Sequence, residues 1–378
     1  MKKISILLTL ALSFSLLAAC GSNNTETPVE NQQENNSAVS QTVLGQAKES
    51  SGDENDFLLP EYDYNANELK LPDLSTGAAA ASYSFDVPQT PLLTDMTSRG
   101  FIVMLSSQAT ADVQNTGGVT IISGDSSAET LYYWLFDEKL NLQKQYELTD
   151  ETLVNGLWAS VFAIAPDGKY LVYAEGPSLY QYTFDTQELA EITPSISETV
   201  YFDAIGYSDS GNYLAFFGSL DGQENTTAYG SIDLNNSTAS VFIADDFSGS
   251  MLSVNGEYAA ISDTVLPNSM GGAEKTGSVL FLDLVKQEGK KISVESGEES
   301  GLAAVSADGQ YIVTCAGGDS PSGILRAYQV SDGTIAVKHN YTMNTNCKPY
   351  EILIIGHSVY AALGTDSGHT ISQSVDLP

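Results

Sequence analysis

The chain has 378 residues, of which 42% are hydrophobic, so it is long enough for one large or two ordinary globular domains. Its 48 acidic and 15 basic residues give a formal net charge of -33. Such a charge would repel nucleic acid phosphates and anionic lipid headgroups, so we expect no nucleic acid partner and favour cationic or neutral partners.

The first twenty residues have the layout of an export signal. Lys2 and Lys3 precede an apolar run, residues 4–19, that is too short to span a membrane comfortably. Residues 17–20, Leu-Ala-Ala-Cys, resemble the lipobox of bacterial lipoproteins. The resemblance implies that residues 1–19 are removed and that Cys20 carries a diacylglycerol with fatty acids such as palmitate. We therefore expect a lipid anchor on the extracytoplasmic side of the cell membrane; the alternative is an ordinary secretory signal with an incidental cysteine.

Residues 20–78 have the composition of a disordered acidic linker. Asn, Gln, Ser, Glu and Asp dominate, and no apolar periodicity is present. A flexible chain of this kind would hold a folded domain near the membrane and let it reorient. Residues 57–72 contain more apolar and aromatic side chains, which either dock on the domain or form a sticky piece of linker.

A short turn phrase recurs through the rest of the chain. Its four clear copies end at tyrosines that are 43, 45 and 53 residues apart, Tyr170, Tyr213, Tyr258 and Tyr311. Periods of this size are typical of repeat architectures with one supersecondary unit per repeat. In each copy a glycine, Gly168 in the first, follows mostly small or polar residues, as expected for a type I turn followed by a left-handed residue.

Each turn is followed by runs that indicate strands. Residues 170–174, Tyr-Leu-Val-Tyr-Ala, are apolar at successive positions and should be buried on both faces. A further apolar run ending in aspartate and a more polar run come next, and no helix-period segment separates the units. Four antiparallel strands per unit predict an all-β fold, a β-propeller. A β-sandwich is the alternative, but it does not explain the period.

Two of the turn phrases also carry a resemblance. Residues 165–173, Ala-Pro-Asp-Gly-Lys-Tyr-Leu-Val-Tyr, and 306–314, Ser-Ala-Asp-Gly-Gln-Tyr-Ile-Val-Thr, resemble the Ser-Pro-Asp-Gly-Lys motif of WD-repeat-like β-propellers. Such repeats occur in the propeller of the periplasmic Tol translocation protein. The resemblance covers residues 79–378 and implies the fold; it does not imply an activity, because propellers of this kind serve binding and enzymatic proteins alike.

The period divides the propeller domain, residues 79–378, into six expected blades. Their ranges are 89–150, 151–196, 199–245, 247–296, 299–345 and 348–378. The last range holds only three strands, and residues 80–88 are expected to supply the fourth, because an open sheet edge is a liability. Seven blades are the alternative, because the range 89–150 is long.

Recognition is expected at one end of the propeller. In an up-and-down blade the loops between the second and third strands lie at the same end as the connections between blades. These loops vary in length here, and variable loops on a repeated scaffold commonly bind partners. The candidate binding residues at this end are Asp112, Asp125, Glu198, Asp245, Asp246, Asn268, Met270, Glu298, Glu299 and Asp319. Their charge favours a cationic protein or peptide of the cell envelope, unless the acids only keep the protein soluble.

Two cysteines, Cys315 and Cys347, remain in the propeller domain. The expected strand order places Cys315 at the end of the second strand of the fifth blade and Cys347 in the connection to the sixth blade. Both positions belong to the same end of neighbouring segments, so a disulfide is feasible in an exported protein. Two buried thiols are the alternative.

No motif in the sequence predicts catalysis. His339, His357 and His369 lack metal-ligand spacing, no loop has the ligand spacing of a calcium site, and residues 356–360 lack the closing glycine of a nucleophile elbow. We therefore expect a monomeric, non-enzymatic binding or scaffold protein without a metal or cofactor. A propeller enzyme of the lactonase type, acting on a small polar substrate, is the alternative.

Overall fold

The computed structural model describes most of the repeated region. The described residues are 48–49, 60–72, 79–108, 112–116, 119–123, 131–148, 153, 157, 161–196, 198–221, 223, 226–263, 266–267, 273–274, 277–295, 302–317, 320–365 and 370–378. The chain forms two compact units. The smaller comprises residues 1–42 and 111–125 and contains the antiparallel hairpin of β7 (Asp112–Thr116) and β8 (Val119–Ser123). The larger comprises residues 43–110 and 126–378.

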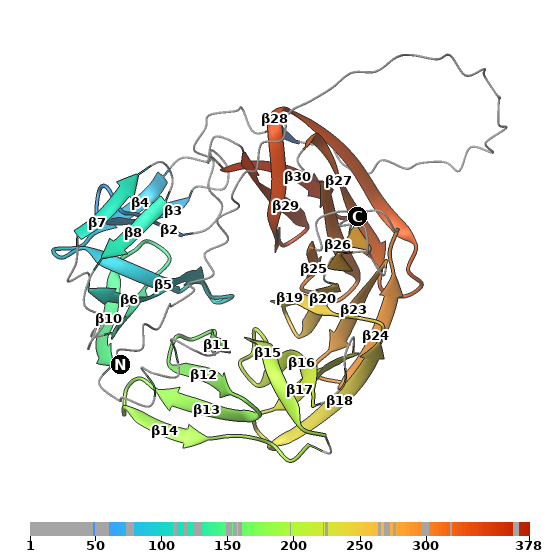
Figure 1. The fold of residues 1–378 in the computed structure, drawn as a ribbon, viewed down its shortest axis with the longest axis horizontal. Helices are drawn as coiled ribbons and strands as arrows, with labels where there is room; N and C mark the ends of the chain where they lie inside the picture. Colours follow the sequence, from blue (N-terminus) through green and yellow to red (C-terminus); the bar gives the residue numbers. More distant parts are fainter. Residues whose placement is uncertain are drawn as a thin grey trace, which may run out of the picture. The chain divides into compact units, whose positions relative to one another are not determined.

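Four sheets of the larger unit each have four antiparallel strands (Figure 1). The first is β5 (Gln89–Met96), β6 (Ile102–Gln108), β9 (Leu131–Phe136) and β10 (Leu142–Leu148). The second is β11 (Val161–Ile164), β12 (Tyr170–Glu175), β13 (Ser178–Thr183) and β14 (Glu188–Glu191). The third is β15 (Val200–Tyr207), β16 (Tyr213–Leu220), β17 (Thr226–Asp233) and β18 (Thr238–Asp245). The fourth is β19 (Gly249–Asn255), β20 (Tyr258–Asp263), β23 (Ser278–Asp283) and β24 (Glu288–Ser293), and the short β21 (Leu266–Pro267) and β22 (Ala273–Glu274) pair in the loop between β20 and β23.

A seven-stranded sheet contains two more blades that share one long strand. The first is β25 (Leu302–Val305), β26 (Tyr311–Gly317), β27 (Ser320–Gln329) and the first part of β28 (Ile335–Ile355). The second is the remainder of β28, β29 (Ser358–Thr365), β30 (Thr370–Asp376) and β1 (Lys48–Glu49). Cys347, expected in a connection between blades, instead lies within β28, where it is paired with both β27 and β29.

A three-stranded sheet is a further blade, so the described residues form seven blades and the prediction of six is wrong. It contains β2 (Glu61–Asp63), β3 (Glu68–Pro72) and β4 (Ala79–Ser84). Residues 60–72, expected to belong to the disordered linker, thus contain two strands of this blade. They fold because Tyr62 and Leu69, only 6% and 0% exposed, are buried in an apolar cluster with Phe85 and Trp134.

The closing strand also differs from the expectation. Residues 79–84 are β4, at the edge of the three-stranded sheet next to β3, and do not complete the last blade. The fourth strand of the last blade is β1, which pairs antiparallel with β30 through Lys48 and Glu49. Closure therefore pairs an early segment of the chain with the last strand, as expected, but this segment lies some thirty residues earlier than predicted.

The glycine turns lie where the sequence predicted them, between the first and second strands of their blades. Gly168, Gly211, Gly256 and Gly309 have φ values of 68°, 76°, 61° and 68°, a region that a Cβ disfavours. Gly168 donates its N–H to the carbonyl of Ala165 at 2.8 Å, which closes the turn. The phrase therefore marks one end of each blade that carries it.

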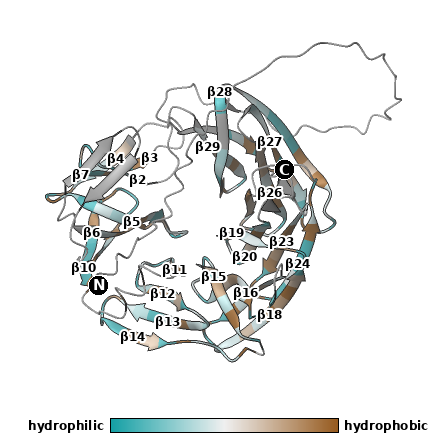
Figure 2. Cartoon of the chain, in the orientation of Figure 1, coloured by the Kyte–Doolittle hydropathy of each residue, from teal (hydrophilic) through white to brown (hydrophobic). Residues whose placement is uncertain are grey.

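Neighbouring blades pack through the side chains of their middle strands. Between the β5–β10 and β11–β14 blades the rings of Tyr133 and Phe184 stack with centroids 3.7 Å apart, and their exposed fractions are 0% and 1%. The outer strand β10 is mostly exposed and hydrophilic (Figure 2), as predicted for fourth strands. Burial of the middle strands is therefore the main source of stability between blades.

Candidate functional site

The two ends of the blades differ in what they carry. The turn rim is the end formed by the turns between the first and second strands and between the third and fourth strands. The loop rim is the opposite end, with the second-to-third loops and the connections between blades. The antiparallel order of each four-stranded sheet assigns the predicted recognition loops to the loop rim.

Three of the candidate binding residues are described with their side chains. Glu198 lies between β14 and β15, Asp245 ends β18, and Asp246 begins the connection to β19; all three are exposed. Asp246 has a φ of 50°, a conformation that aspartate tolerates better than most residues. The structure therefore presents carboxylates in two connections of the loop rim.

The other predicted residues cannot be placed at a site. Asp112 belongs to β7 of the smaller unit, and its side chain lies outside the described residues. Seven further predicted positions lie outside the described residues altogether: Asp125, Asn268, Met270, Glu298, Glu299, Asp319 and the lipidation residue Cys20. Within the described part of the chain, no helix combines the length and hydrophobicity needed to cross a membrane.

One acid near the loop rim is already engaged by basic groups. Glu295, after β24, accepts from Arg326 Nη2 at 2.6 Å and lies 3.7 Å from Lys338 Nζ. Arg326 is only 9% exposed, so water hydrates its charge poorly and the Glu295 carboxylate is needed to compensate it. Glu295 therefore holds the β25–β28 blade and is a poor candidate for recognition.

Hydrogen bonds between blades occupy the turn rim. Arg99 Nη2 donates to the carbonyl of Ser210 at 2.8 Å, and the Ser210 N–H donates to Glu257 Oε1 at 2.9 Å. Asn255 Nδ2 donates to the carbonyls of Val305 and Ile354, at 3.1 and 3.3 Å. These bonds satisfy backbone groups of the turns across blades, so much of this rim has a structural role.

Three carboxyls that the sequence analysis did not single out lie on first strands. Asp95 belongs to β5, Asp203 to β15 and Glu351 to the second part of β28. First strands of successive blades contact one another, as β11 does β15 and β15 does β19. Asp95 and Asp203 are exposed, so water reaches this innermost layer.

The surroundings of these carboxyls disfavour their charged forms. Burial raises the pKa of Glu351 to about 7, and repulsion by Asp95 adds to the shift. Asp95 reaches water, but the protein groups that surround it still remove much of its hydration and raise its pKa to about 6, although the Met96 N–H donates to its carboxylate at 2.7 Å. A sequence signal for Glu351 exists: it is an acid directly before the apolar run 352–355 of a strand.

Glu351→Gln should stabilise the protein at pH 8 but not at pH 4. The pKa of Glu351 in the folded state lies above its ordinary value, so the stability present at pH 4 is lost as the pH rises through about 7. We expect the thermal unfolding midpoint at pH 8 to rise by about 2–4 °C, roughly 1 kcal/mol after allowance for solvent screening. Calorimetry at both pH values measures this, with the exposed Glu188→Gln as control. An equal gain at both pH values would contradict the assignment.

The disulfide between Cys315 and Cys347 stays a prediction. Cys315 is fully buried, and its Sγ lies 3.7 Å from Tyr341 Oη. Cys347 is paired with Ser320 in the backbone register, whereas Cys315 is paired with Leu325 of the same strand β27. The side chain of Cys347 lies outside the described residues.

Comparisons with known proteins give structural likenesses at low sequence identity. Neither a family model nor a curated protein matched the chain. Hydrazine synthase of Kuenenia stuttgartiensis is 13% identical with a TM-score of 0.49, over 82% of this chain and 90% of that one. The β-propeller domain of the trilobed protease from Pyrococcus furiosus is 13% identical with a TM-score of 0.44, over 73% and 79% of the two chains.

A third structure, an acylaminoacyl peptidase in complex with a chloromethyl ketone, is 14% identical with a TM-score of 0.42. The match covers 73% of this chain but 43% of the peptidase. Because these likenesses are weak, the assignment of a β-propeller depends on the strand order and pairing described above.

Proposed function

We propose that the chain is a lipid-anchored extracytoplasmic propeller that binds a positively charged protein or peptide of the cell envelope through its loop rim. The observation that carries the proposal is the exposure of Glu198, Asp245 and Asp246 in connections of this rim. The turn rim, by contrast, is occupied by hydrogen bonds between blades, such as that from Arg99 to Ser210.

The sequence supports the other parts of the proposal. The lipobox-like residues 17–20 support acylation at Cys20 and a place at the membrane. The net charge of -33 supports a cationic partner, because electrostatic complementarity speeds association and disfavours partners of the same charge. The WD-repeat-like motif supports the propeller fold and does not favour binding over catalysis.

Reversing the charge of the loop rim should weaken partner capture. Asp245→Lys with Asp246→Lys should reduce the partner recovered by cross-linking in intact cells about tenfold, because attraction becomes repulsion. Quantitative mass spectrometry of the captured proteins measures the loss. The matched control, Glu138→Lys with Glu188→Lys, makes the same charge change at two exposed positions of the turn rim. Cys20→Ala in the same cells should move the protein out of the membrane fraction.

Equal recovery from the loop-rim and turn-rim variants would contradict recognition at the loop rim. Retention of Cys20→Ala in the membrane fraction would contradict the lipid anchor. The two parts of the proposal are thus tested separately.

Acid–base chemistry at the innermost layer is a second candidate function, corresponding to a propeller enzyme acting on a small polar substrate. The specific observation in its favour is the pair Asp95 and Glu351, whose raised pKa values of about 6 and about 7 suit proton transfer near neutral pH. Lactone hydrolysis by the purified protein that is lost in Glu351→Gln would support this function over the binding scaffold.

A further inference from the structure

The first strands of four blades share an irregularity. In each, the pairing with the second strand skips one residue, as in a β-bulge, and the skipped residues are Leu92, Asp203, Ser250 and Tyr350. A bulge bends its strand and changes the direction of the side chain of the extra residue. Asp203 is the only charged residue of these four. The bulge of β15 therefore presents a carboxylate at the innermost layer.

Tyr201 lies two positions before Asp203 and is exposed on the same side of the strand. It is the second residue of β15 and so lies next to the loop rim. Val200 and Phe202 are buried in the cluster shared with the preceding blade, whereas Asp203 is exposed and Tyr201 is 40% exposed. In the strand register Tyr201 is paired with Ser219, which is small and exposed, so the strand pairing does not cover the ring.

Met251 of the next blade lies beside this pair. Gly249 packs on the Phe217 ring, since a Cβ at position 249 would lie 2.7 Å from it, and Phe217 is paired with the residue directly after the bulge. Further along β19, Val254 packs on Gly206 of β15, where a Cβ would lie 2.8 Å from its side chain. Met251 lies between these two contacts and is 42% exposed. An aromatic, an aliphatic and an acidic side chain are thus exposed together on two adjoining first strands.

The acidic groups of this surface are open to a positive charge. Burial raises the pKa of Asp203, and no positive charge of the described residues offsets this effect. The connection that leads to β19 adds the exposed Asp245 and Asp246. The cation beside this connection, Lys291, donates to the main-chain carbonyl of Asp245 at 3.4 Å and lies 5.7 Å from the centroid of the Phe247 ring. Since Lys291 is held by main chain and ring, a cationic ligand is favoured at the carboxylates.

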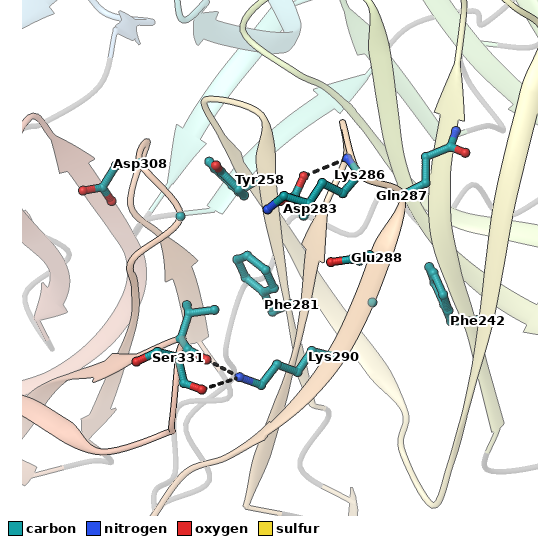
Figure 3. Close-up of a pocket in the computed structure, with 13 residues that line it drawn as sticks. Phe242, Tyr258, Phe281, Asp283, Lys286, Gln287, Glu288, Lys290, Asp308 and Ser331 are labelled. Atoms are coloured by element: carbon teal, nitrogen blue, oxygen red, sulfur yellow. Dashed lines mark hydrogen bonds and ion pairs between the residues drawn. The ribbon is translucent and has the colours of Figure 1, made fainter.

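A cleft of about 620 Å³ at the turn rim does not offer such a surface (Figure 3). Phe281 in its lining is only 7% exposed and stacks on Tyr258 with centroids 5.8 Å apart. Lys286 is paired with Asp283 at 2.7 Å, and Lys290 donates to two main-chain carbonyls. The rings and both lysines are therefore engaged within the protein, and the lysines would repel a cationic partner.

From these features we propose that Tyr201, Asp203 and Met251 form the docking site for an arginine side chain of the partner. The inference rests on the proposed function, because it names the anchor of the same loop-rim recognition. Arginine fits better than lysine, because its planar guanidinium stacks on an aromatic ring and donates two parallel hydrogen bonds to a carboxylate. Residues two apart in a strand are separated by about 7 Å, so one guanidinium can contact both side chains. The methylene groups of the arginine lie against Met251.

Fluorescence anisotropy with labelled hexaarginine and hexalysine tests the proposal on the purified full chain. Hexaarginine should bind about fivefold more tightly, because only arginine gains the stacking contact. Tyr201→Ala should weaken hexaarginine binding about fivefold and hexalysine binding little, whereas Tyr201→Phe keeps the ring face and should retain the preference. Asp203→Asn should weaken binding of both peptides, because both need its charge. These side chains are exposed, so the thermal unfolding midpoint should not change.

Matched variants separate this site from general effects of ring loss and charge loss. Tyr64→Ala removes a ring that is 41% exposed beside the three-stranded sheet, and should leave both affinities unchanged. Asp86→Asn removes one exposed carboxylate between β4 and β5, and should weaken binding less than Asp203→Asn. Asp245→Lys with Asp246→Lys should weaken binding of both peptides, and this variant tests the proposed function itself.

Equal binding of the two peptides, or equal losses in Tyr201→Ala and Tyr64→Ala, would overturn the arginine site. Absence of hexaarginine binding would also overturn it. If the Asp245→Lys, Asp246→Lys variant then loses hexalysine, recognition at the loop rim stands without an arginine anchor. Conversely, an arginine preference that depends on Tyr201 but survives this charge reversal would support the arginine site and contradict the role proposed for the connection.

Discussion

A chain that begins at residue 79 should fail to form a stable propeller. The truncation removes β1, β2 and β3, and with them the buried Tyr62 and Leu69. The Phe85 ring, 5.7 Å from Tyr62 and 5.0 Å from Trp134 between centroids, would then be exposed. Loss of several large buried side chains at about 2–5 kcal/mol each exceeds the usual stability of a domain. Thermal unfolding followed by near-ultraviolet circular dichroism measures the effect.

The control for the truncation is a chain that begins at residue 43, where the larger unit starts. It keeps all seven blades and should unfold at the temperature of the chain that begins at Cys20. A single substitution tests the same contact: Leu69→Ala should lower the free energy of unfolding by about 2–5 kcal/mol. Its control is Leu142→Ala, at a side chain that is 37% exposed, which should lower it much less. Cooperative unfolding of the chain from residue 79 at an unchanged temperature would show that the three-stranded blade is dispensable.

Gly256→Ala should destabilise the protein much more than Gly356→Ala. The two glycines have the same φ of 61°, so alanine meets the same backbone strain at both, about 1–2 kcal/mol. At position 256 the new Cβ would also lie 2.3 Å from the carbonyl oxygen of Ala307, whereas nothing lies within 4 Å at position 356. Because backbone must move to relieve this clash, we expect a loss of about 3 kcal/mol or more for Gly256→Ala.

Urea unfolding of the two glycine variants measures the difference directly. Gly356→Ala is the matched control, because it carries the conformational strain without the collision. Equal shifts in the midpoint would mean that the turn between β19 and β20 can move away from the next blade. A larger shift for Gly356→Ala would contradict the packing described for both turns.

Local signals in the sequence predicted most of the fold. The recurring glycine turns and the apolar runs after them gave six blades whose ranges match sheets in the structure, because each blade pairs strands that are close in sequence. The seventh blade was missed because its turn contains asparagine and aspartate in place of the recurring glycine. Asn67 takes the left-handed conformation there, and the Asp63 carboxylate accepts from the N–H groups of Asn65 and Ala66.

The candidate sites were less predictable. Asp245 and Asp246 could be assigned to the loop rim because strand order alone sets the ends of a blade. The proximity of Asp95 to Glu351 could not be predicted from the sequence, because β5 and β28 lie far apart in the chain. Asp95 raises the pKa of Glu351 only through space.

The sequence by itself determined the all-β class, the repeat, the positions of the glycine turns and the acidic character of the connections, because these follow from backbone preference and composition over a few residues. The tertiary structure decided the number of blades, the strand that closes the last blade and the proximity of Asp95 to Glu351. Each of these depends on segments that are far apart in the sequence and meet only in the folded chain, where strand pairing and side-chain packing bring them together.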